Sequence, residues 1–562
     1  MKNIYKIIET EFRNSFFYLI ILMVIASILE MFGISLIIPV MLSLSSQNIF
    51  SEYPFLEKIN LMLGLPSNDE LILISISIFG LVYIFKNLYM TLFYYLESNF
   101  LAKILEKISQ NLFFTYVHQP YEFYTNLNTS ELITRFRSDL PAFRSSIIAF
   151  SNIFIETFIL IGITFFLAIY NLEVFLIVFL LVTFFSIAFS LFFKKKFKSL
   201  GIEKQIVETS RSKSLQETFN AIREIKISKL ELVFINAYNL ISTRLKFNFA
   251  GTSFLRNLPR IFFEILAITI LLSIIYFIFF WTNFEISSVL PVVGVFTGAA
   301  IKVLPSTNRL ISSLNTIKYN NKSIEMIIKD LEKPKNFEYN NIIELKKFEL
   351  KNISFKYNEK CIFDNVNLTI NHGEKIFIYG ETGCGKSTLL DLILGLKKPS
   401  KGEIIINGNK ISNTNYSFNK ILGYVPQNVF LFDDTLKNNI TLFKEINNKN
   451  YFDQCIKIAR LEKFISNLSL KEDSLVGQNG VKLSGGQKQR VGISRELYKD
   501  PNIYVFDEST NSLDEKTEEE FFNNFLNFAI DKTIIFVSHN QKLKQYFHKV
   551  YKLKNQKIYE EK

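Results

Sequence analysis

Long apolar runs in roughly the first 320 residues constrain the fold of this chain more than any other feature. A helix needs about 20 apolar residues to cross a hydrocarbon core of about 30 Å. Runs of this length recur, and the first and last exceed the minimum, so these two helices tilt or extend beyond the bilayer. We therefore expect six membrane-spanning helices, at approximately 15–44, 71–96, 146–170, 172–193, 259–281 and 286–310.

The rest of the chain, roughly 240 residues, has the composition of a water-soluble α/β protein. Over the whole chain 49% of the residues are apolar and the mean hydropathy is +0.19, values that favour the membrane class. Lys333-Pro334-Lys335-Asn336 and the polar residues after it interrupt the helical pattern. We expect a transmembrane domain at 1–325, a linker at 326–346 and a second domain at 347–562.

The net charge of +12 is distributed as in a membrane protein and argues against nucleic acid as a partner. Basic residues gather beside the ends of apolar runs, as at 194–198, and this bias sets membrane topology. The segment 45–70 has only Lys58 against four acidic residues, Glu52, Glu57, Asp69 and Glu70. Both termini and the second domain are therefore expected in the cytoplasm. The three cysteines lack a C-x-x-C spacing, so neither a disulfide framework nor a zinc site is indicated.

The two cytoplasmic connections, between 96 and 146 and between 193 and 259, are long and helical in pattern. The simplest interpretation continues the neighbouring spans as helices into the cytoplasm. Each connection then turns once, near 120–130, where proline, asparagine and serine interrupt the pattern, and near 221–229.

A complete G-x-x-x-x-G-K-[ST] phosphate loop follows an apolar strand at 376–379 and opens an apolar helix at 389–394. Its residues are Gly380, Glu381, Thr382, Gly383, Cys384, Gly385, Lys386, Ser387 and Thr388. The glycines let backbone N–H groups close around phosphate oxygens, with the positive end of the helix behind them. Lys386 is expected to reach the β- and γ-phosphates, and Ser387 to hold Mg²⁺.

Two further motifs complete a nucleotide site. The segment 504–508 predicts a buried strand that ends in two carboxylates. Asp507 is placed to bind Mg²⁺, and Glu508 to polarise or deprotonate an attacking water. Between this strand and the phosphate loop lies L-S-G-G-Q at 483–487, which leads into a helix and can offer N–H groups to a phosphate.

These motifs, in this order, resemble the ATPase domain of ABC transporters, in which L-S-G-G-Q is the signature motif. The resemblance implies that ATP and Mg²⁺ bind and that Glu508 and His539 are catalytic, with His539 as the switch histidine. It implies Mg²⁺ contacts from Ser387, Gln427 and Asp507. The further nucleotide contacts that it implies are Tyr357 on the adenine, Gln427, the signature residues Ser484, Gly485, Gly486 and Gln487, and Asp514 of the D-loop.

Six spans ahead of the ATPase resemble the exporter type of ABC transporter. The fold class expected is thus multidomain, a six-helix α-helical transmembrane domain of ABC exporter type followed by an α/β P-loop ATPase domain. The turns near 121–128 and 223–229 then correspond to coupling helices. Because the signature motif completes the site of a second copy, a chain with one ATPase domain is expected to work as a homodimer with two hydrolysing sites. Gln478 departs from the family, since many exporters have an acidic residue there.

Ionisable residues inside or near the ends of the spans bear on the cargo, because such residues are costly in lipid and face a cavity or one another. They are Glu30, Lys86, Glu156, Arg260, Glu264 and Lys302. One interpretation pairs these charges between helices. The other places Lys86, Arg260 and Lys302 around a cavity, where they contact an anionic head group.

The segment 45–70 mixes apolar and charged residues between Pro54 and Pro66, which favours a short amphipathic helix at the membrane surface; a plain loop is the alternative. With the basic residues and the sequence 30–39, it resembles the PglK-like flippases of bacterial lipid-linked oligosaccharides. The resemblance implies transport of a polyprenyl-pyrophosphate-linked oligosaccharide to the outer face of the bacterial plasma membrane. An exporter of peptides, drugs or other lipids is the alternative. The apolar runs argue against a soluble ABC ATPase.

Overall fold

The computed structural model describes residues 2–35, 68–125, 127–170, 172–281, 286–334, 340–341, 344–357, 360–411, 416–417 and 421–561. Most of the expected surface helix at 45–70, and the end of the first expected span, lie outside these residues. The chain forms two compact units. One comprises 1–119 and 124–335, and the other comprises 120–123 and 336–562.

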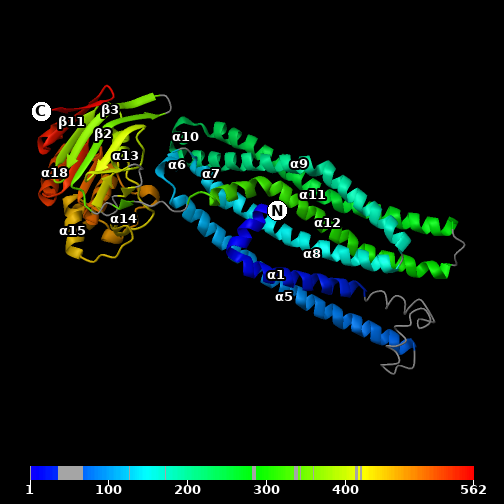
Figure 1. Cartoon of the computed structure of the whole chain (residues 1–562). Helices are drawn as coiled ribbons and strands as arrows, with labels where there is room; N and C mark the ends of the chain where they lie inside the picture. The colour runs from blue at the N-terminus through cyan, green and yellow to red at the C-terminus, as the bar shows by residue number, and fades with distance from the viewer. Residues whose placement is uncertain are drawn as a thin grey trace. The chain divides into compact units, whose positions relative to one another are not determined.

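In its described residues the first unit is helical (Figure 1). Its long helices are α1 (Lys2–Ser35), α5 (Asn68–Val117), α8 (Leu140–Tyr170), α9 (Leu172–Asn220), α11 (Glu231–Trp281) and α12 (Ile286–Leu331). Each contains the described part of one expected span. α5 has 50 residues and is therefore about 75 Å long, more than twice the hydrocarbon thickness. By length and composition, the described stretches Ile76–Val117 and Thr129–Phe165 can each cross a membrane.

Short elements occupy the two places where the sequence predicts turns, and the first group extends beyond its predicted turn to residue 139. They are α6 (Tyr121–Thr125), α7 (Thr129–Thr134), the π-helix η1 (Arg135–Asp139) and α10 (Ile222–Ser228). Lys229 ends α10 in the left-handed region, with φ of 52°. α8 packs on α12 and α1, and α9 packs on α11 and α12 (Figure 1). α12 continues through the first part of the expected linker.

The second unit is built on two sheets. In the larger sheet the strand order is β12-β11-β4-β10-β9-β8, and all neighbours are parallel except β11 and β12. Its strands are β4 (Lys375–Gly380), β8 (Leu422–Val425), β9 (Ile503–Asp507), β10 (Thr533–Val537), β11 (Lys549–Lys554) and β12 (Lys557–Glu561). The smaller sheet is antiparallel, in the order β3-β2-β5-β6. Its strands are β2 (Lys347–Tyr357), β3 (Lys360–Asn371), β5 (Lys401–Ile406) and β6 (Asn409–Ile411).

The remaining elements of this unit surround the two sheets. β1 (Asn340–Asn341) and β7 (Tyr416–Ser417) form a short parallel pair. The helices are α13 (Lys386–Ile393), α14 (Leu436–Thr441), α15 (Lys449–Ile458), α16 (Glu462–Ser466), α17 (Gly485–Lys499) and α18 (Glu515–Phe528), with short turns η3 (Lys471–Asp473), η4 (Gln478–Gly480) and η5 (Gln541–Tyr546). Every residue of β9 and β10 is buried, as expected for central strands of a parallel sheet covered on both faces.

Aromatic rings fill the core between the large sheet and α18. Phe522 is fully buried, and its ring centroid lies 5.0 Å from that of Phe536 and 5.4 Å from that of Tyr546. These contacts hold α18 on β10. The carboxyl ends of β4, β9 and β10 therefore rest on a close-packed base, and the functional loops follow these ends.

Replacing Phe522 by alanine removes this packing and leaves a cavity. We expect the Phe522→Ala change to lower the free energy of unfolding of the second unit by about 3–5 kcal/mol. The matched control is Ile530→Ala, because the side chain of Ile530 is 67% exposed and its loss leaves no cavity. Urea unfolding of both variants measures the difference; equal losses would contradict this account of the core.

Candidate functional site

The phosphate loop adopts a path that requires glycine at two positions. Gly383 and Gly385 have φ of +83° and +104°, where other residues are strained. A Cβ atom at Gly385 would also lie 2.7 Å from Cγ2 of Ile362 and 3.0 Å from Cζ of Phe363. The loop therefore presents bare backbone at the carboxyl end of β4.

α13 begins at Lys386, directly after the loop, and Gly385 provides no side-chain cap for it. The first N–H groups of a helix lack intrahelical partners, and the helix dipole makes this end positive. Together with the glycine backbone, this end of α13 suits an anionic phosphate group. The residues present thus fit a nucleoside triphosphate.

The Lys386 side chain lies inside the loop and is only 7% exposed. Its Nζ donates to the carbonyl oxygens of Gly380, at 3.1 Å, and Glu381, at 3.3 Å. It also lies 3.0 Å from Nε2 of His539 and 3.5 Å from Oε1 of Glu508. The structure therefore joins the loop lysine to the two residues predicted to be catalytic.

Glu508 is the meeting point of this cluster. Its Oε1 lies 2.7 Å from Nε2 of His539, and its Oε2 accepts a hydrogen bond from Nε2 of Gln427 at 2.8 Å. Nδ2 of Asn511 donates to the same oxygen at 3.3 Å. Glu508 has φ of +49°, a costly backbone conformation for a non-glycine residue that is frequent at functional sites. Sequence reasoning missed Asn511, which belongs to no recognised motif.

Asp507 differs from Glu508 in being buried at the end of β9, with 8% of its surface exposed. Burial, and then the neighbouring Glu508 carboxylate, raise the pKa of Asp507 to about 6. The hydroxyl group of Tyr424 donates to Oδ2 of Asp507 at 3.4 Å. No sequence motif points to Tyr424, because its contact with Asp507 crosses from β8 to β9.

Asp507, Ser387 and Gln427 suit Mg²⁺ only if oxygen atoms of a bound phosphate complete the coordination of the ion. In the described residues, no group of three or more histidine, cysteine, aspartate or glutamate side chains is arranged to hold a metal ion. Mg²⁺ commonly uses one or two carboxylates together with substrate phosphates and waters. Asp507, with the Ser387 hydroxyl on the first turn of α13 and the Gln427 amide, fits that pattern.

The signature segment has its own contacts. Ser484 caps α17: its Oγ accepts from the backbone N–H of Gln487 at 3.3 Å, and Oε1 of Gln487 accepts from the N–H of Ser484 at 2.8 Å. A Cβ atom on Gly486 would lie 2.8 Å from the carbonyl oxygen of Ser512, so α17 and the D-loop touch. Asp514 caps α18 by accepting from the N–H of Thr517 at 3.1 Å.

Hydrogen bonds described for 484–487 stay within α17 and its cap, and none reaches the phosphate loop. Tyr357, predicted to contact adenine, lies at the end of β2 with a ring that is 42% exposed. Lys397 Nζ contacts its hydroxyl group and lies 4.6 Å from its ring centroid. One chain thus assembles the phosphate loop with Gln427, Glu508 and His539, but not with the signature segment.

The charges of the membrane helices are largely paired. Nζ of Lys86 on α5 donates to Oε2 of Glu30 on α1 at 3.1 Å, and Lys86 is buried. Arg260 pairs with Glu264 on the same helix at 2.9 Å, and its side chain is 72% exposed. The side chain of Lys302 lies outside the described residues. Sequence reasoning missed Arg309, on α12, which binds both carboxylate oxygens of Glu156 on α8.

Comparisons with known proteins identify both units. The family model described as the ABC transporter transmembrane region matches residues 16–297, and the family model described as ABC transporter matches residues 363–511. The structure is similar to that of a bacterial Atm1-family ABC exporter with ATP bound, with a TM-score of 0.78 and 18% identity, over 96% of this chain and 94% of that one. The expected fold class is therefore confirmed.

Curated relatives carry export and flippase names. A putative export ATP-binding/permease protein of Rickettsia typhi is 28% identical, over 79% of this chain and 78% of that protein. The ATP-dependent lipid A-core flippase of Syntrophus aciditrophicus is 26% identical, over 78% and 74% respectively. The pediocin PA-1 transport/processing protein PedD of Pediococcus acidilactici is 28% identical, over 83% and 66%.

Glu508→Gln keeps the shape of the side chain and its neighbours but removes the basic oxygen. We expect ATP hydrolysis to fall by about 100-fold or more, because general-base catalysis contributes about 10²–10⁴-fold. Binding of a fluorescent ATP analogue should remain close to that of the unchanged protein. Undiminished hydrolysis would contradict the role assigned to Glu508.

The raised pKa of Asp507 predicts a pH-dependent cost in stability. An unfolded aspartate titrates near 4, so between about pH 4 and 6 the folded protein holds a proton that the unfolded chain has released. Stability is therefore lost as the pH rises through this window. Without nucleotide at pH 7.5, Asp507→Asn should have a free energy of unfolding higher than that of the unchanged protein by at most about 3 kcal/mol, and it should unfold at a higher temperature.

That advantage should shrink as the pH falls towards 5, whereas addition of Mg²⁺ and ATP should stabilise the unchanged protein more than the variant. Thermal unfolding from pH 5 to 8, with and without nucleotide, measures both effects. A difference that does not change with pH would refute the proposed cause.

Proposed function

This chain belongs to the ABC transporters, and from that premise we propose that it flips a polyprenyl-pyrophosphate-linked oligosaccharide across the bacterial plasma membrane. Transport of the exporter type, coupled to ATP hydrolysis, follows from the family. The direction in the proposal is from the cytoplasmic to the outer face. The ATPase domain and both termini then lie in the cytoplasm, as the distribution of basic residues predicts.

The phosphate loop and the cluster around Glu508 contain a residue for each task in ATP hydrolysis: binding phosphate, holding the metal and activating water. The phosphate loop and Lys386 bind the β- and γ-phosphates, and Ser387, Gln427 and Asp507 hold Mg²⁺, which neutralises phosphate charge. To do this, Lys386 exchanges its contacts with loop carbonyls and Glu508 for phosphate oxygens. Release from the ammonium group makes the Glu508 carboxylate available to accept a hydrogen bond from the attacking water.

His539 and Gln427 hold Glu508 from two sides, so they orient its carboxylate towards the phosphate loop. In this proposal His539 then contacts the γ-phosphate, and the amide group of Gln427 would contribute to holding the metal. Tyr357 stacks on the adenine through its half-exposed ring. Orientation of this kind lowers the barrier because the reacting groups are already in place.

A second copy of the chain completes the site in this proposal. Among the described residues of one chain, residues 484–487 contact the D-loop and their own helix cap, and not the phosphate loop. The N-terminus of α17 can therefore bind a phosphate group outside its own chain. In a homodimer, this N-terminus and Asp514 meet the ATP bound by the partner. Two ATP molecules then lie between two ATPase domains, and both are hydrolysed because Glu508 is present in each.

Arg260 is the observation that carries the proposal for the cargo. Its pair with Glu264 is exposed on a helix stretch predicted to lie within the membrane. Contact of these charges with acyl chains is costly, so this face of α11 favours an aqueous cavity, a polar cargo or the partner copy. An arginine in a cavity binds phosphate through two parallel hydrogen bonds, as a pyrophosphate head group requires.

The other two predicted basic residues, Lys86 and Lys302, give the cargo proposal less support than Arg260 does. Lys86 is buried against Glu30 and can serve mainly to join α1 and α5, and Lys302 stays a prediction. Arg309 keeps 53% of its side chain exposed beside Glu156, so it adds a second guanidinium group that can face a cavity. The similarity to PedD supports export of a peptide as a second candidate.

Arg260→Gln should separate these candidates. In proteoliposomes, a polyprenyl-pyrophosphate glycan should stimulate ATP hydrolysis by the unchanged protein, and the variant should need at least about tenfold more glycan, because it lacks the charge-assisted hydrogen bonds of the guanidinium group. Arg244→Gln is the matched control, because Arg244 lies on the same helix outside the predicted span and pairs with Glu203 at 3.7 Å. Stimulation by peptides and not by the glycan would overturn the flippase proposal.

A further inference from the structure

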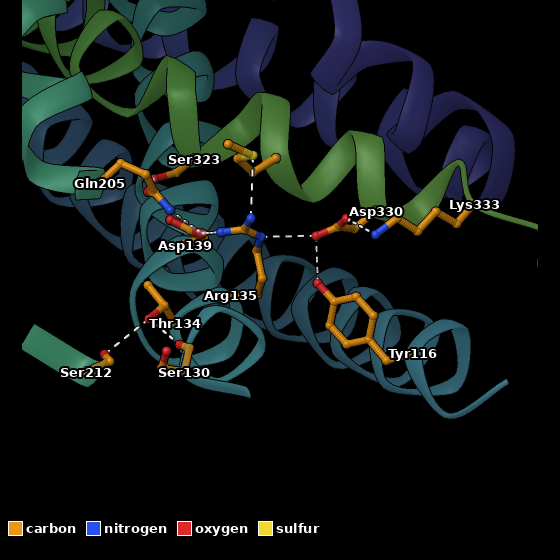
Figure 2. A network of polar contacts seen from close by, with 11 residues as sticks. Tyr116, Ser130, Thr134, Arg135, Asp139, Gln205, Ser212, Ser323, Asp330 and Lys333 are labelled. Atoms are coloured by element: carbon orange, nitrogen blue, oxygen red, sulfur yellow. Dashed lines mark hydrogen bonds and ion pairs between the residues drawn. The ribbon is translucent and has the colours of Figure 1, made fainter. Parts of the chain in front are cut away.

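A buried polar cluster joins several helices of the first unit outside their predicted spans (Figure 2). Asp330, near the end of α12, is its centre. Its Oδ2 accepts from the hydroxyl group of Tyr116 at 2.7 Å and from Nε of Arg135 at 3.0 Å, and its Oδ1 accepts from Nζ of Lys333 at 2.6 Å. One carboxylate therefore holds the end of α5, η1 and the residues that follow α12.

Arg135 extends the cluster to a second carboxylate. Its Nη1 donates to Oδ2 of Asp139 at 3.0 Å, and the same oxygen accepts from Nε2 of Gln205, on α9, at 3.1 Å. Oγ of Ser323, back on α12, donates to Gln205 at 3.2 Å. The Arg135 side chain is 11% exposed and that of Asp139 is fully buried, so water competes little for these bonds.

The backbone at Arg135 is itself unusual. Residues Arg135–Asp139 form a π-helix, in which the N–H of Leu140 donates to the carbonyl oxygen of Arg135. Such wide turns are rare and occur frequently at functional sites. Here Arg135 and Asp139 are both buried, whereas Arg137 between them is exposed. The wide turn thus accommodates two interior charges on one short segment.

The path of the chain gives this cluster its significance. Residues 120–123 belong to the second unit, so the chain leaves the first unit after Gln119, returns at Tyr124 and leaves again after residue 335. Tyr116 precedes the first exit and Lys333 precedes the second, while Arg135 follows the return. Nε2 of Gln119 also donates to the carbonyl oxygen of Pro334 at 3.2 Å, which joins the two exits directly.

The Asp330 carboxyl group stays ionised at neutral pH. Burial alone would raise the pKa of Asp330, but the donors from Lys333, Tyr116 and Arg135 outweigh burial and hold the pKa below its usual value. A guanidinium group has a rigid fork of donors, whereas an ammonium group is a single point charge. Arg135 can therefore bridge two carboxylates in a fixed geometry.

We propose that Arg135 is a positioning residue for ATP-driven transport, which bridges Asp139 and Asp330 so that the end of α12 and the segment after α6 move as one body. A rearrangement of the ATPase unit then reaches α5, α8, α9 and α12 together. The inference rests on the proposed function in one respect, namely that nucleotide binding to the ATPase unit drives the membrane helices.

Arg135→Lys tests the bridge without leaving the buried carboxylates unpaired. The lysine keeps the positive charge but cannot present the fork that spans both acids. Tyr116→Phe is a second variant, which removes one donor to Asp330 and keeps the ring. Arg211→Lys is the matched control, because Arg211 pairs at 3.1 Å with Glu208 within one turn of α9 and, among the described residues, forms no ion pair with another element.

The measurement is amide hydrogen exchange of the full-length protein in lipid nanodiscs, with and without Mg²⁺, ATP and vanadate. In the unchanged protein and in Arg211→Lys, nucleotide should change the rate of amide hydrogen exchange in peptides from the phosphate loop and from α8, α9 and α12. In Arg135→Lys the phosphate loop should respond fully, with hydrolysis within about twofold, while the response of the helices falls by at least about fivefold. Tyr116→Phe should give a smaller loss of the same kind.

Normal responses of the helices in Arg135→Lys would overturn the inference, because the bridge would then be dispensable. An unchanged protein whose phosphate loop responds while its membrane helices do not would overturn it too. Absence of any response at the phosphate loop of the unchanged protein is a different result. It would refute nucleotide binding at the proposed site and remove the premise on which the inference rests.

Discussion

The register of three buried parallel strands determines the geometry of the ATP site. Val537 on β10 lies opposite both Ile378 on β4 and Asp507 on β9, so the strands end at one level. The residues that follow them, among them Glu508 and His539, therefore meet at the same edge of the sheet. A slip of one residue would turn the side chains to the opposite face, and because both faces of β9 and β10 are covered by close-packed side chains, it would disrupt the packing on both.

The same strand ends carry local costs that the core has to offset. Glu508 holds a left-handed backbone conformation, and Asp507 is a carboxyl group whose burial disfavours its charged form. Neither feature helps the chain to fold. Both place oxygen atoms where a metal ion, a phosphate group and a water can meet, so the aromatic packing beneath them stabilises a site that is unfavourable by itself.

The sequence predicts those parts of the structure that local patterns determine. Apolar runs predict the long helices, motif spacing predicts the roles of Lys386 and Glu508, and the family resemblance implies the role of His539. Tyr424 and Asn511 belong to no motif and reach the site through the fold. The bond between Arg135 and Asp330 joins helices that are distant in sequence, and no periodicity predicts which charges of two helices will meet.

The charge pairs of the first unit are of two kinds, those that join separate helices and those within one helix. Lys86 with Glu30, and Arg309 with Glu156, join separate helices, and in each pair at least one partner is nearly buried. Arg260 and Glu264 lie on one helix and are both exposed, so their separation moves no element and exposes no buried charge. A cargo that passes through a cavity has to exchange partners with the protein repeatedly. Exposed groups, such as Arg260 and the half-exposed Arg309, can make that exchange, whereas Lys86, which is buried against Glu30, resists it.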